Sequence, residues 1–177
     1  MFLYSFITEL LIKPHIPIIG RDKAEWLHNK ILELEPKKIL ELGTANGYSG
    51  CVLGSEGAEL TTIEIDPIIA EEAKLNFEEF EINANIIVGD GVEEVNKLTE
   101  NENNLESFDL IFIDFANKKY IQVLENCIKL VKNKGIIISD NILREDCEEY
   151  KDEVLNHPRL KTEIIEIDNG MSYSVRT

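Results

Sequence analysis

Short apolar segments alternate with stretches of helical periodicity along most of this chain, and this alternation limits the possible folds more than any other feature. KILEL and FDLIFID are bounded by turn residues, whereas Ala24, Leu27 and Ile31 have the spacing of one helical face. Strands that alternate with helices at this spacing form right-handed βαβ units, and therefore an α/β fold with a parallel sheet and helices on both faces. The five expected parallel strands are residues 38–42, 60–65, 85–89, 108–114 and 135–141.

The end of the chain has a different pattern. KTEIIEI and MSYSV are two further strand-like runs, and they are joined through Asp168, Asn169 and Gly170. An Asn-Gly turn between two such runs is typical of a tight hairpin. We therefore expect a seven-stranded, mostly parallel sheet that finishes with an antiparallel hairpin.

Local signals mark several helix boundaries. Asp22 and Glu25 have the spacing of a capping box, and Pro36 ends that helix. Asp66 followed by Pro67 supplies an N-cap and a first-turn proline to the helix after the second strand.

The length and composition predict one domain. The chain has 177 residues, of which 44% are hydrophobic and 29% charged, enough for one substantial core. We expect a helical cap over residues 1–35 and a core over residues 36–177. The apolar start, MFLYSFITELLI, lacks a basic leader and a cleavage site and is too short to cross a bilayer. We interpret it as a helix packed on the domain or on a partner subunit, with a signal peptide as the alternative.

Charge and cysteine content limit the partners. The formal net charge of -16 argues against nonspecific nucleic-acid binding, because such a surface repels polyanions. Cys51, Cys127 and Cys147 are odd in number and lack CxxC spacing, which indicates a reduced, cytoplasmic protein with Cys51 and Cys127 in its core.

A glycine turn follows the first strand in ILELGTANGYSG. Gly43 and Gly47 lack a Cβ, so the main chain can approach a ligand closely and adopt left-handed conformations there. Glu64 ends the second strand, where a carboxylate can accept hydrogen bonds from the two hydroxyls of a ribose. Neither GxGxxG nor GxxxxGK[ST] is present, which favours a nucleoside without phosphates. The alternative is that the glycines only form a tight turn.

Oxygen-bearing side chains end the fourth and fifth strands. Asp114 follows one, and Asp140 with Asn141 follows the other, so the sheet would bring all three to one edge. Carboxylate and amide oxygens suit a hard divalent cation such as Mg²⁺. The alternative is that Asp140 and Asn141 cap a loop while Asp114 binds the amino group of a cofactor.

Five motifs in order resemble those of a known family: ELGTANGYSG, TTIEIDP, VGDG, FDLIFID and IISDN, before a DNGMSYSVR hairpin. They resemble the class I S-adenosylmethionine-dependent methyltransferases, and within these the cation-dependent O-methyltransferases related to catechol and caffeoyl-CoA methyltransferases. The match runs from about Ile18 to the C-terminus. The resemblance implies a Rossmann-like fold, S-adenosylmethionine and a divalent cation as cofactors, a small hydroxylated acceptor and a homodimer.

The resemblance also assigns roles to individual residues. Ser49 matches the hydroxyl that holds the methionine carboxylate, Glu64 the ribose-binding acid, and Asp90 with Gly91 the adenine contacts. Asp114, Asp140 and Asn141 match the cation ligands. The full set of implied cofactor residues is Ile19, Glu41, Gly43, Ala45, Gly47, Ser49, Glu64, Asp90, Gly91 and Asp114.

The sequence departs from the family at the expected general base. The family usually has a lysine three positions after the first metal aspartate, but FIDFANKKY has Asn117 there and Lys118 one position later. An amide does not accept a proton usefully, so the expected catalytic pair is Lys118 and Asp114. If Lys118 is only a solvated residue, the cation alone must acidify the acceptor hydroxyl.

Other interpretations remain open at this stage. A relative of this kind could methylate a tRNA hydroxyl, or the chain could bind the nucleoside without transferring a methyl group, or it could be a nicotinamide dehydrogenase. The dehydrogenase hypothesis requires the absent GxGxxG motif. His15, His28 and His157 share no ligand spacing, and we expect them at the surface or at an interface rather than in a catalytic site.

Overall fold

The computed structural model describes residues 18–177. The chain divides into two compact units between Gly89 and Asp90, and we describe each unit separately. The expected helix over the first twelve residues lies outside the described residues. The single-domain organisation and the cap over residues 1–35 stay predictions.

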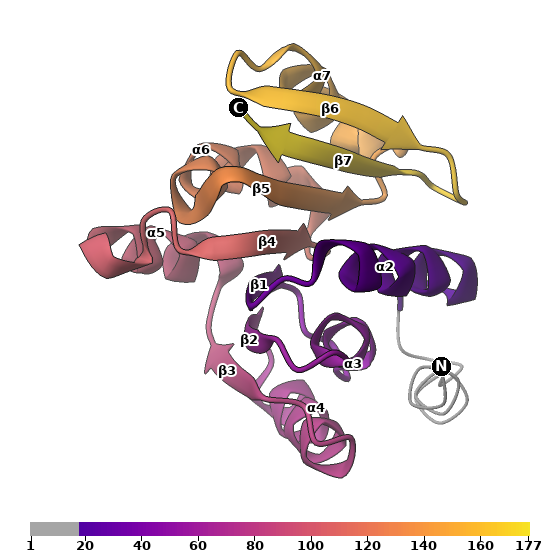
Figure 1. The fold of residues 1–177 in the computed structure, drawn as a ribbon, viewed down its shortest axis with the longest axis vertical. Helices are drawn as coiled ribbons and strands as arrows, with labels where there is room; N and C mark the ends of the chain where they lie inside the picture. Colours follow the sequence, from indigo (N-terminus) through magenta and orange to yellow (C-terminus); the bar gives the residue numbers. More distant parts are fainter. Residues whose placement is uncertain (1–17) are drawn as a thin grey trace. The chain divides into compact units, whose positions relative to one another are not determined.

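The first unit contains a parallel sheet with strand order β3-β2-β1 (Figure 1). Helices α3 and α4 pack against these strands, and α2 packs on α3. The register pairs Glu41 with Thr62 and Glu64 with Val88, so two of the acidic residues singled out from the sequence lie on adjacent strands. The elements are α2 (Arg21–Leu34), β1 (Lys38–Leu42), α3 (Tyr48–Gly54), β2 (Glu59–Glu64), α4 (Pro67–Glu79) and β3 (Ala84–Val88).

The start of α2 differs from the expectation. The N-cap residue is Gly20, with φ 76°, and no side chain caps the helix. The predicted capping box of Asp22 and Glu25 is therefore wrong, because the helix already begins at Arg21 and Asp22 lies inside its first turn. The predicted cap of α4 is confirmed: the Asp66 carboxylate accepts from the backbone N–H groups two and three residues later.

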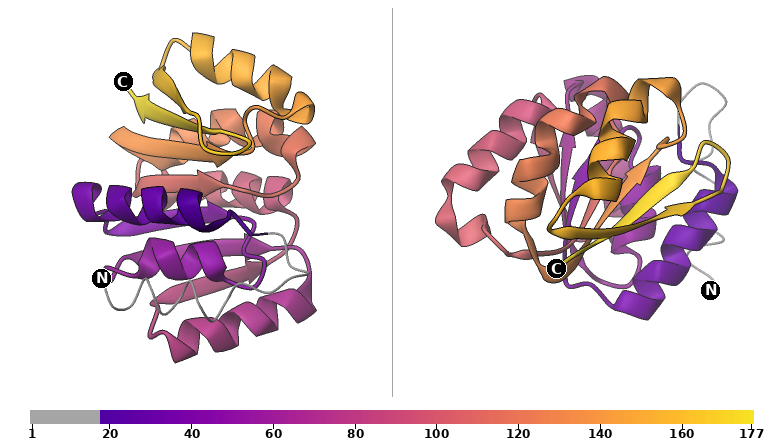
Figure 2. Two further views of the ribbon diagram at one scale, coloured as in Figure 1. Left: turned by 90° about the vertical axis from the view of Figure 1, so that its right-hand side faces the viewer. Right: turned by 90° about the horizontal axis from the view of Figure 1, so that it is seen from above.

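The second unit contains the strand order β4-β5-β7-β6, with β4 and β5 parallel and the last two strands antiparallel (Figure 2). This confirms the C-terminal hairpin. Helix α6 packs on β4 and β5, and α7 packs on β6 and β7. The elements are α5 (Gly91–Glu100), η1 (Glu102–Asn104), β4 (Phe108–Ile113), η2 (Asn117–Lys119), α6 (Tyr120–Leu130), β5 (Val131–Asp140), η3 (Glu145–Cys147), α7 (Glu148–Asn156), β6 (Leu160–Ile165) and β7 (Met171–Arg176).

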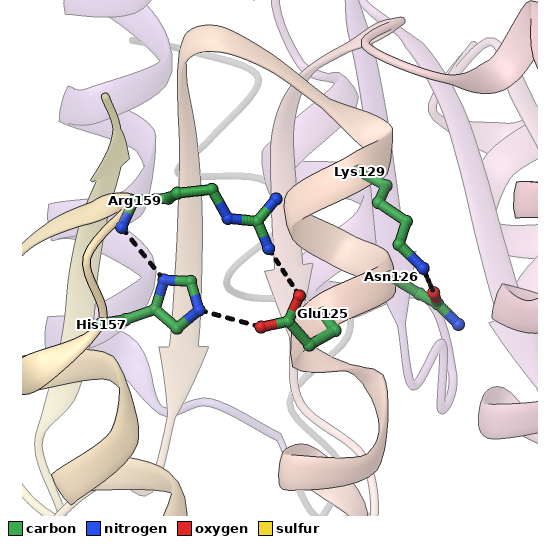
Figure 3. A network of polar contacts seen from close by, with 5 residues as sticks. All are labelled: Glu125, Asn126, Lys129, His157 and Arg159. Carbon is green, nitrogen blue, oxygen red and sulfur yellow. Dashed lines mark hydrogen bonds and ion pairs between the residues drawn. The ribbon is translucent and has the colours of Figure 1, made fainter.

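A polar network joins α6 to the segment between α7 and β6 (Figure 3). The backbone N–H of Arg159 donates to His157 Nδ1 at 3.2 Å, so the proton of a neutral ring is on Nε2, which donates to Glu125 Oε1 at 2.9 Å. The Arg159 guanidinium donates to the other oxygen of Glu125. His157 and His28 are both 6% exposed, so the expectation of surface histidines is wrong for these two residues.

The three cysteines are free and buried, which confirms the core positions of Cys51 and Cys127. Within residues 18–177, no helix combines the length and the apolar character that a transmembrane helix requires.

Candidate functional site

The turn after β1 adopts the backbone that its glycines allow. Gly43 and Gly47 have φ values of 100° and 86°, which side-chain-bearing residues rarely adopt. Ala45 between them is also left-handed, with φ 47°, and its N–H donates to Glu64 Oε2 at 2.9 Å. The glycine turn and the acid at the end of β2 are therefore joined directly by a hydrogen bond.

Glu64 is held from both sides by the main chain. Besides the bond from Ala45, its Oε1 accepts from the backbone N–H of Asp66 at 3.0 Å. The residue is 9% exposed. Each carboxylate oxygen can accept more than one hydrogen bond, so this arrangement fixes the carboxylate and leaves capacity for hydroxyl donors.

Glu41 is the penultimate residue of β1 and is fully buried. Its two oxygens each accept a hydroxyl hydrogen bond at 2.6 Å, one from Ser49 and one from Thr62. Burial raises the pKa of the Glu41 carboxyl to about 7, although both hydrogen bonds oppose the rise. Sequence reasoning missed this network. The Ser49 hydroxyl, expected to hold a ligand carboxylate, already donates its proton to Glu41.

Ile19, expected in a loop over the cofactor, is 5% exposed and therefore belongs to the core of the first unit. Gly20 follows it with a left-handed backbone and is the N-cap of α2. This junction could not be recognised from sequence, because an isolated glycine before a helix is a common feature.

In the second unit, Asp90 has two structural partners. Its Oδ1 caps α5 by accepting from the N–H groups of Val92 and Glu93, and its Oδ2 accepts from Lys119 Nζ at 2.5 Å. The bond from Lys119 is the first cause of a lowered pKa of the Asp90 carboxyl. A Cβ on Gly91 would lie 3.1 Å from the ring of Phe115, so this ring covers the first turn of α5.

Two of the expected cation ligands, Asp114 and Asn141, lie in contact where β4 and β5 end. Asp140 is the last residue of β5 and is 3% exposed. Asn141 follows with φ 59°, and its amide nitrogen lies 3.4 Å from Asp114 Oδ1. A half-turn of this amide would present its oxygen instead, which gives a donor set of two carboxylates and an amide that fits a hard divalent cation. Residues 18–177 contain no group of three or more His, Cys, Asp or Glu side chains that could hold a metal ion.

The three residues around the expected base differ in their contacts and in their exposure. Asn117 donates to Asp146 Oδ1 at 3.1 Å, which joins the two short helical turns η2 and η3. This bond is the first cause of a lowered pKa of the Asp146 carboxyl. Lys118 is exposed, whereas Lys119 makes the ion pair with Asp90.

Comparison with known proteins identifies the family. A family model described as O-methyltransferase matches residues 8–169. The chain belongs to the O-methyltransferase family. The resemblance stated from the sequence motifs is thereby confirmed at the level of the family.

Individual members of the O-methyltransferase family share sequence and fold with this chain. Catechol O-methyltransferase B of Danio rerio is 28% identical over 152 residues, which cover 81% of this chain and 57% of that protein. The chain thus spans little more than half the length of this curated relative. A Staphylococcus aureus protein assigned as a caffeoyl-CoA O-methyltransferase has a TM-score of 0.85 at 26% identity, covering 98% of this chain and 92% of that one.

A third comparison bears on the fold alone. The O-methyltransferase from Bacillus cereus, solved in complex with SAH, has a TM-score of 0.83 at 20% identity and covers 99% of this chain and 89% of that one. Together with the Staphylococcus aureus structure, it confirms the Rossmann-like methyltransferase fold that the resemblance implied, and with it the α/β class that the alternation of strands and helices predicted.

Proposed function

We propose that this O-methyltransferase family member transfers a methyl group from S-adenosylmethionine to a hydroxyl of a small, catechol-like acceptor, with help from a divalent cation. The observation that carries the proposal is the carboxylate of Glu64. Two backbone N–H groups fix it at the end of β2, and one of them belongs to the left-handed turn residue Ala45.

Residues of the first unit would hold the ribose and the methionine part of the cofactor. Glu64 would accept the two ribose hydroxyls, while the open backbone at Gly43 and Gly47 would allow close approach of the ligand. S-adenosylmethionine, when bound, supplies a methyl group on a positively charged sulfur. Further support comes from the Bacillus cereus relative solved with SAH. The remaining proposed contacts are Ile19, Glu41, Ser49, Asp90, Gly91 and Asp114.

Residues of the second unit would hold the cation. Asp114, Asp140 and Asn141 offer only oxygen ligands once the amide is turned, and Mg²⁺ prefers such ligands. The cation would lower the pKa of the acceptor hydroxyl and hold the resulting oxyanion. A nearby base would take up the proton of this hydroxyl, and the negative charge of the oxygen and the positive charge of the sulfur would both disappear as the methyl group moves from sulfur to oxygen.

Lys118 is the proposed base, because it is exposed and follows the position at which the family usually has its lysine. Asn117, at that position, donates to Asp146 and cannot serve. This substitution also favours a second candidate function, a protein that binds the nucleoside without transferring the methyl group.

The acceptor and the biological context complete the proposal. The relative from Danio rerio is named a catechol O-methyltransferase, which supports a vicinal diol as the acceptor. The net charge of -16 argues against a tRNA acceptor. The apolar N-terminal sequence and the three free cysteines support a homodimer in the cytoplasm.

The cofactor assignment is tested by calorimetry of the whole chain with S-adenosylmethionine and with NAD. We expect S-adenosylmethionine to bind and NAD not to bind. Glu64→Gln should weaken the binding of S-adenosylmethionine by about tenfold or more. The substitution replaces the charged carboxylate, which would accept hydrogen bonds from the ribose hydroxyls, with a neutral amide. Glu71→Gln, at an exposed position of α4, is the matched control and should bind like the wild type. Equal affinity of both variants would remove Glu64 from the proposed site.

A further inference from the structure

Tyr120, the first residue of α6, contains a buried hydroxyl that no hydrogen bond explains. Its side chain is 0% exposed, and Oη has no hydrogen-bond partner within residues 18–177. A buried hydroxyl without a hydrogen-bond partner destabilises the folded protein relative to a paired one. Such a group in a native protein requires an explanation, and a ligand that pairs with it is one.

Ring stacking holds Tyr120 close to Asp114. The rings of Phe115 and Tyr120 stack with centroids 5.5 Å apart and an interplanar angle of 18°. Phe115 is the residue directly after Asp114, so the Tyr120 ring packs against the immediate neighbour of this aspartate.

A second aromatic contact holds Tyr120 on the side of Asp140. The ring of Tyr150 meets the Tyr120 ring edge-on, with centroids 5.4 Å apart. The Tyr150 hydroxyl in turn hydrogen-bonds the Ser139 hydroxyl at 2.6 Å, and Ser139 directly precedes Asp140. Tyr120 is therefore held between neighbours of both proposed carboxylate ligands.

The electrostatics agree with this placement. Burial is the first cause of a strongly raised pKa of the Tyr120 hydroxyl, followed by the negative charges of Asp114 and Asp140. A phenolic hydroxyl carries one proton and can donate one hydrogen bond.

We propose that Tyr120 is a positioning residue of the cation site, whose hydroxyl donates its one hydrogen bond to the carboxylate of Asp114 or Asp140 when these residues hold a divalent cation. This inference rests on the proposed function, since it requires the cation site. Groups that hydrogen-bond metal ligands orient them and commonly contribute tenfold to a hundredfold to metal affinity.

The test is a calorimetric titration of the whole chain with Mn²⁺, comparing wild type with Tyr120→Phe. We expect Tyr120→Phe to bind Mn²⁺ about tenfold to a hundredfold more weakly. Tyr150→Phe is the matched control: it also removes a buried hydroxyl from the same aromatic cluster, but one that is paired with Ser139, and its Mn²⁺ affinity should stay near that of the wild type. Equal affinity of wild type and Tyr120→Phe would overturn the inference.

Two further measurements distinguish an error in the proposed cation site from an error in the proposed role of Tyr120. Asp140→Asn should abolish the Mn²⁺ signal, and if wild type and Asp140→Asn behave alike, the proposed cation site itself is wrong. Thermal unfolding without cation should show Tyr120→Phe to be at least as stable as the wild type, because it loses only an unpaired hydroxyl. With saturating Mn²⁺ the wild type should gain more stability than the variant. A variant that is already unstable without cation would mean that Tyr120 has only a structural role, which would also overturn the inference.

Discussion

At the residue scale, the charge of Glu41 depends on two opposing effects. The side chain is completely buried, and it also accepts hydrogen bonds from two hydroxyl groups. Burial disfavours the carboxylate, and the bonds from Ser49 and Thr62 favour it. Burial has the larger effect, and the pKa rises from 4.5 to about 7. Glu64, the proposed acceptor of the ribose hydroxyls, lies by contrast at the end of its strand and accepts two backbone N–H groups.

The raised pKa of Glu41 predicts a pH-dependent stability. Between pH 4.5 and 7 the folded protein keeps a proton that the unfolded chain releases. The stability from this group is therefore fully present below pH 4.5 and is lost as the pH rises to about 7. The free energy of unfolding of the wild type should fall relative to Glu41→Gln across this range, by up to about 3 kcal/mol. Urea unfolding at several pH values measures the difference.

The exposed variant Glu71→Gln is the control for this experiment and should show no such trend relative to the wild type. A difference between wild type and Glu41→Gln that does not change with pH would mean that Glu41 does not retain its proton in the folded protein.

The two lysines of η2 also differ in their predicted effects. Lys118→Ala should slow methyl transfer more than Lys119→Ala, because Lys118 is the proposed base and Lys119 pairs with Asp90. Lys119→Ala should instead weaken cofactor binding slightly, since Asp90 is a proposed adenine contact. Initial rates at saturating S-adenosylmethionine distinguish these effects. Equal and negligible effects on the rate would exclude Lys118 from the mechanism.

At the element scale, α3 can pack closely against its neighbours because glycines, which lack side chains, lie on its packed face. A Cβ on Gly50 would lie 2.7 Å from the Phe77 ring and 3.0 Å from Glu41 Oε2. A Cβ on Gly54 would lie 2.5 Å from Ile82. Helix α3 therefore packs against its neighbours at a distance that only glycine permits.

This close packing predicts that Gly50→Ala destabilises the protein by about 1–3 kcal/mol, because overpacking outweighs the better helix propensity of alanine. Gly57→Ala is the comparison: its Cβ would meet nothing within 4 Å, and its cost should come only from the left-handed φ of 81°. Urea unfolding of both variants gives the two values. A Gly50→Ala protein as stable as the wild type would show that α3 can shift away from α4.

Sequence patterns predicted the elements better than the contacts between them. All seven strands were expected, because each apolar run is bounded by turn residues, and the Asp66 cap was expected because Asp-Pro is a strong local signal. The start of α2 was misplaced, since Gly20 ends the preceding segment without any side-chain cap. The bonds from Ser49 to Glu41 and from Asn117 to Asp146 join residues on different elements, and no local pattern could reveal them.

At the scale of the whole molecule, the proposed chemistry is divided between the two units. The residues proposed for the ribose and methionine of the cofactor lie before Gly89, and those proposed for the cation lie after it. The family model covers residues 8–169, which include both sets of residues.

The most direct test of the central claim is a methyl-transfer assay with labelled S-adenosylmethionine and a panel of catechols, run with Mg²⁺ and with EDTA. We predict that the label appears on one hydroxyl oxygen of the acceptor with Mg²⁺, that EDTA abolishes the reaction, and that Asp140→Asn behaves with Mg²⁺ as the wild type does in EDTA. Transfer at an unchanged rate in EDTA, or no labelled product from any catechol while the cofactor binds, would contradict the account.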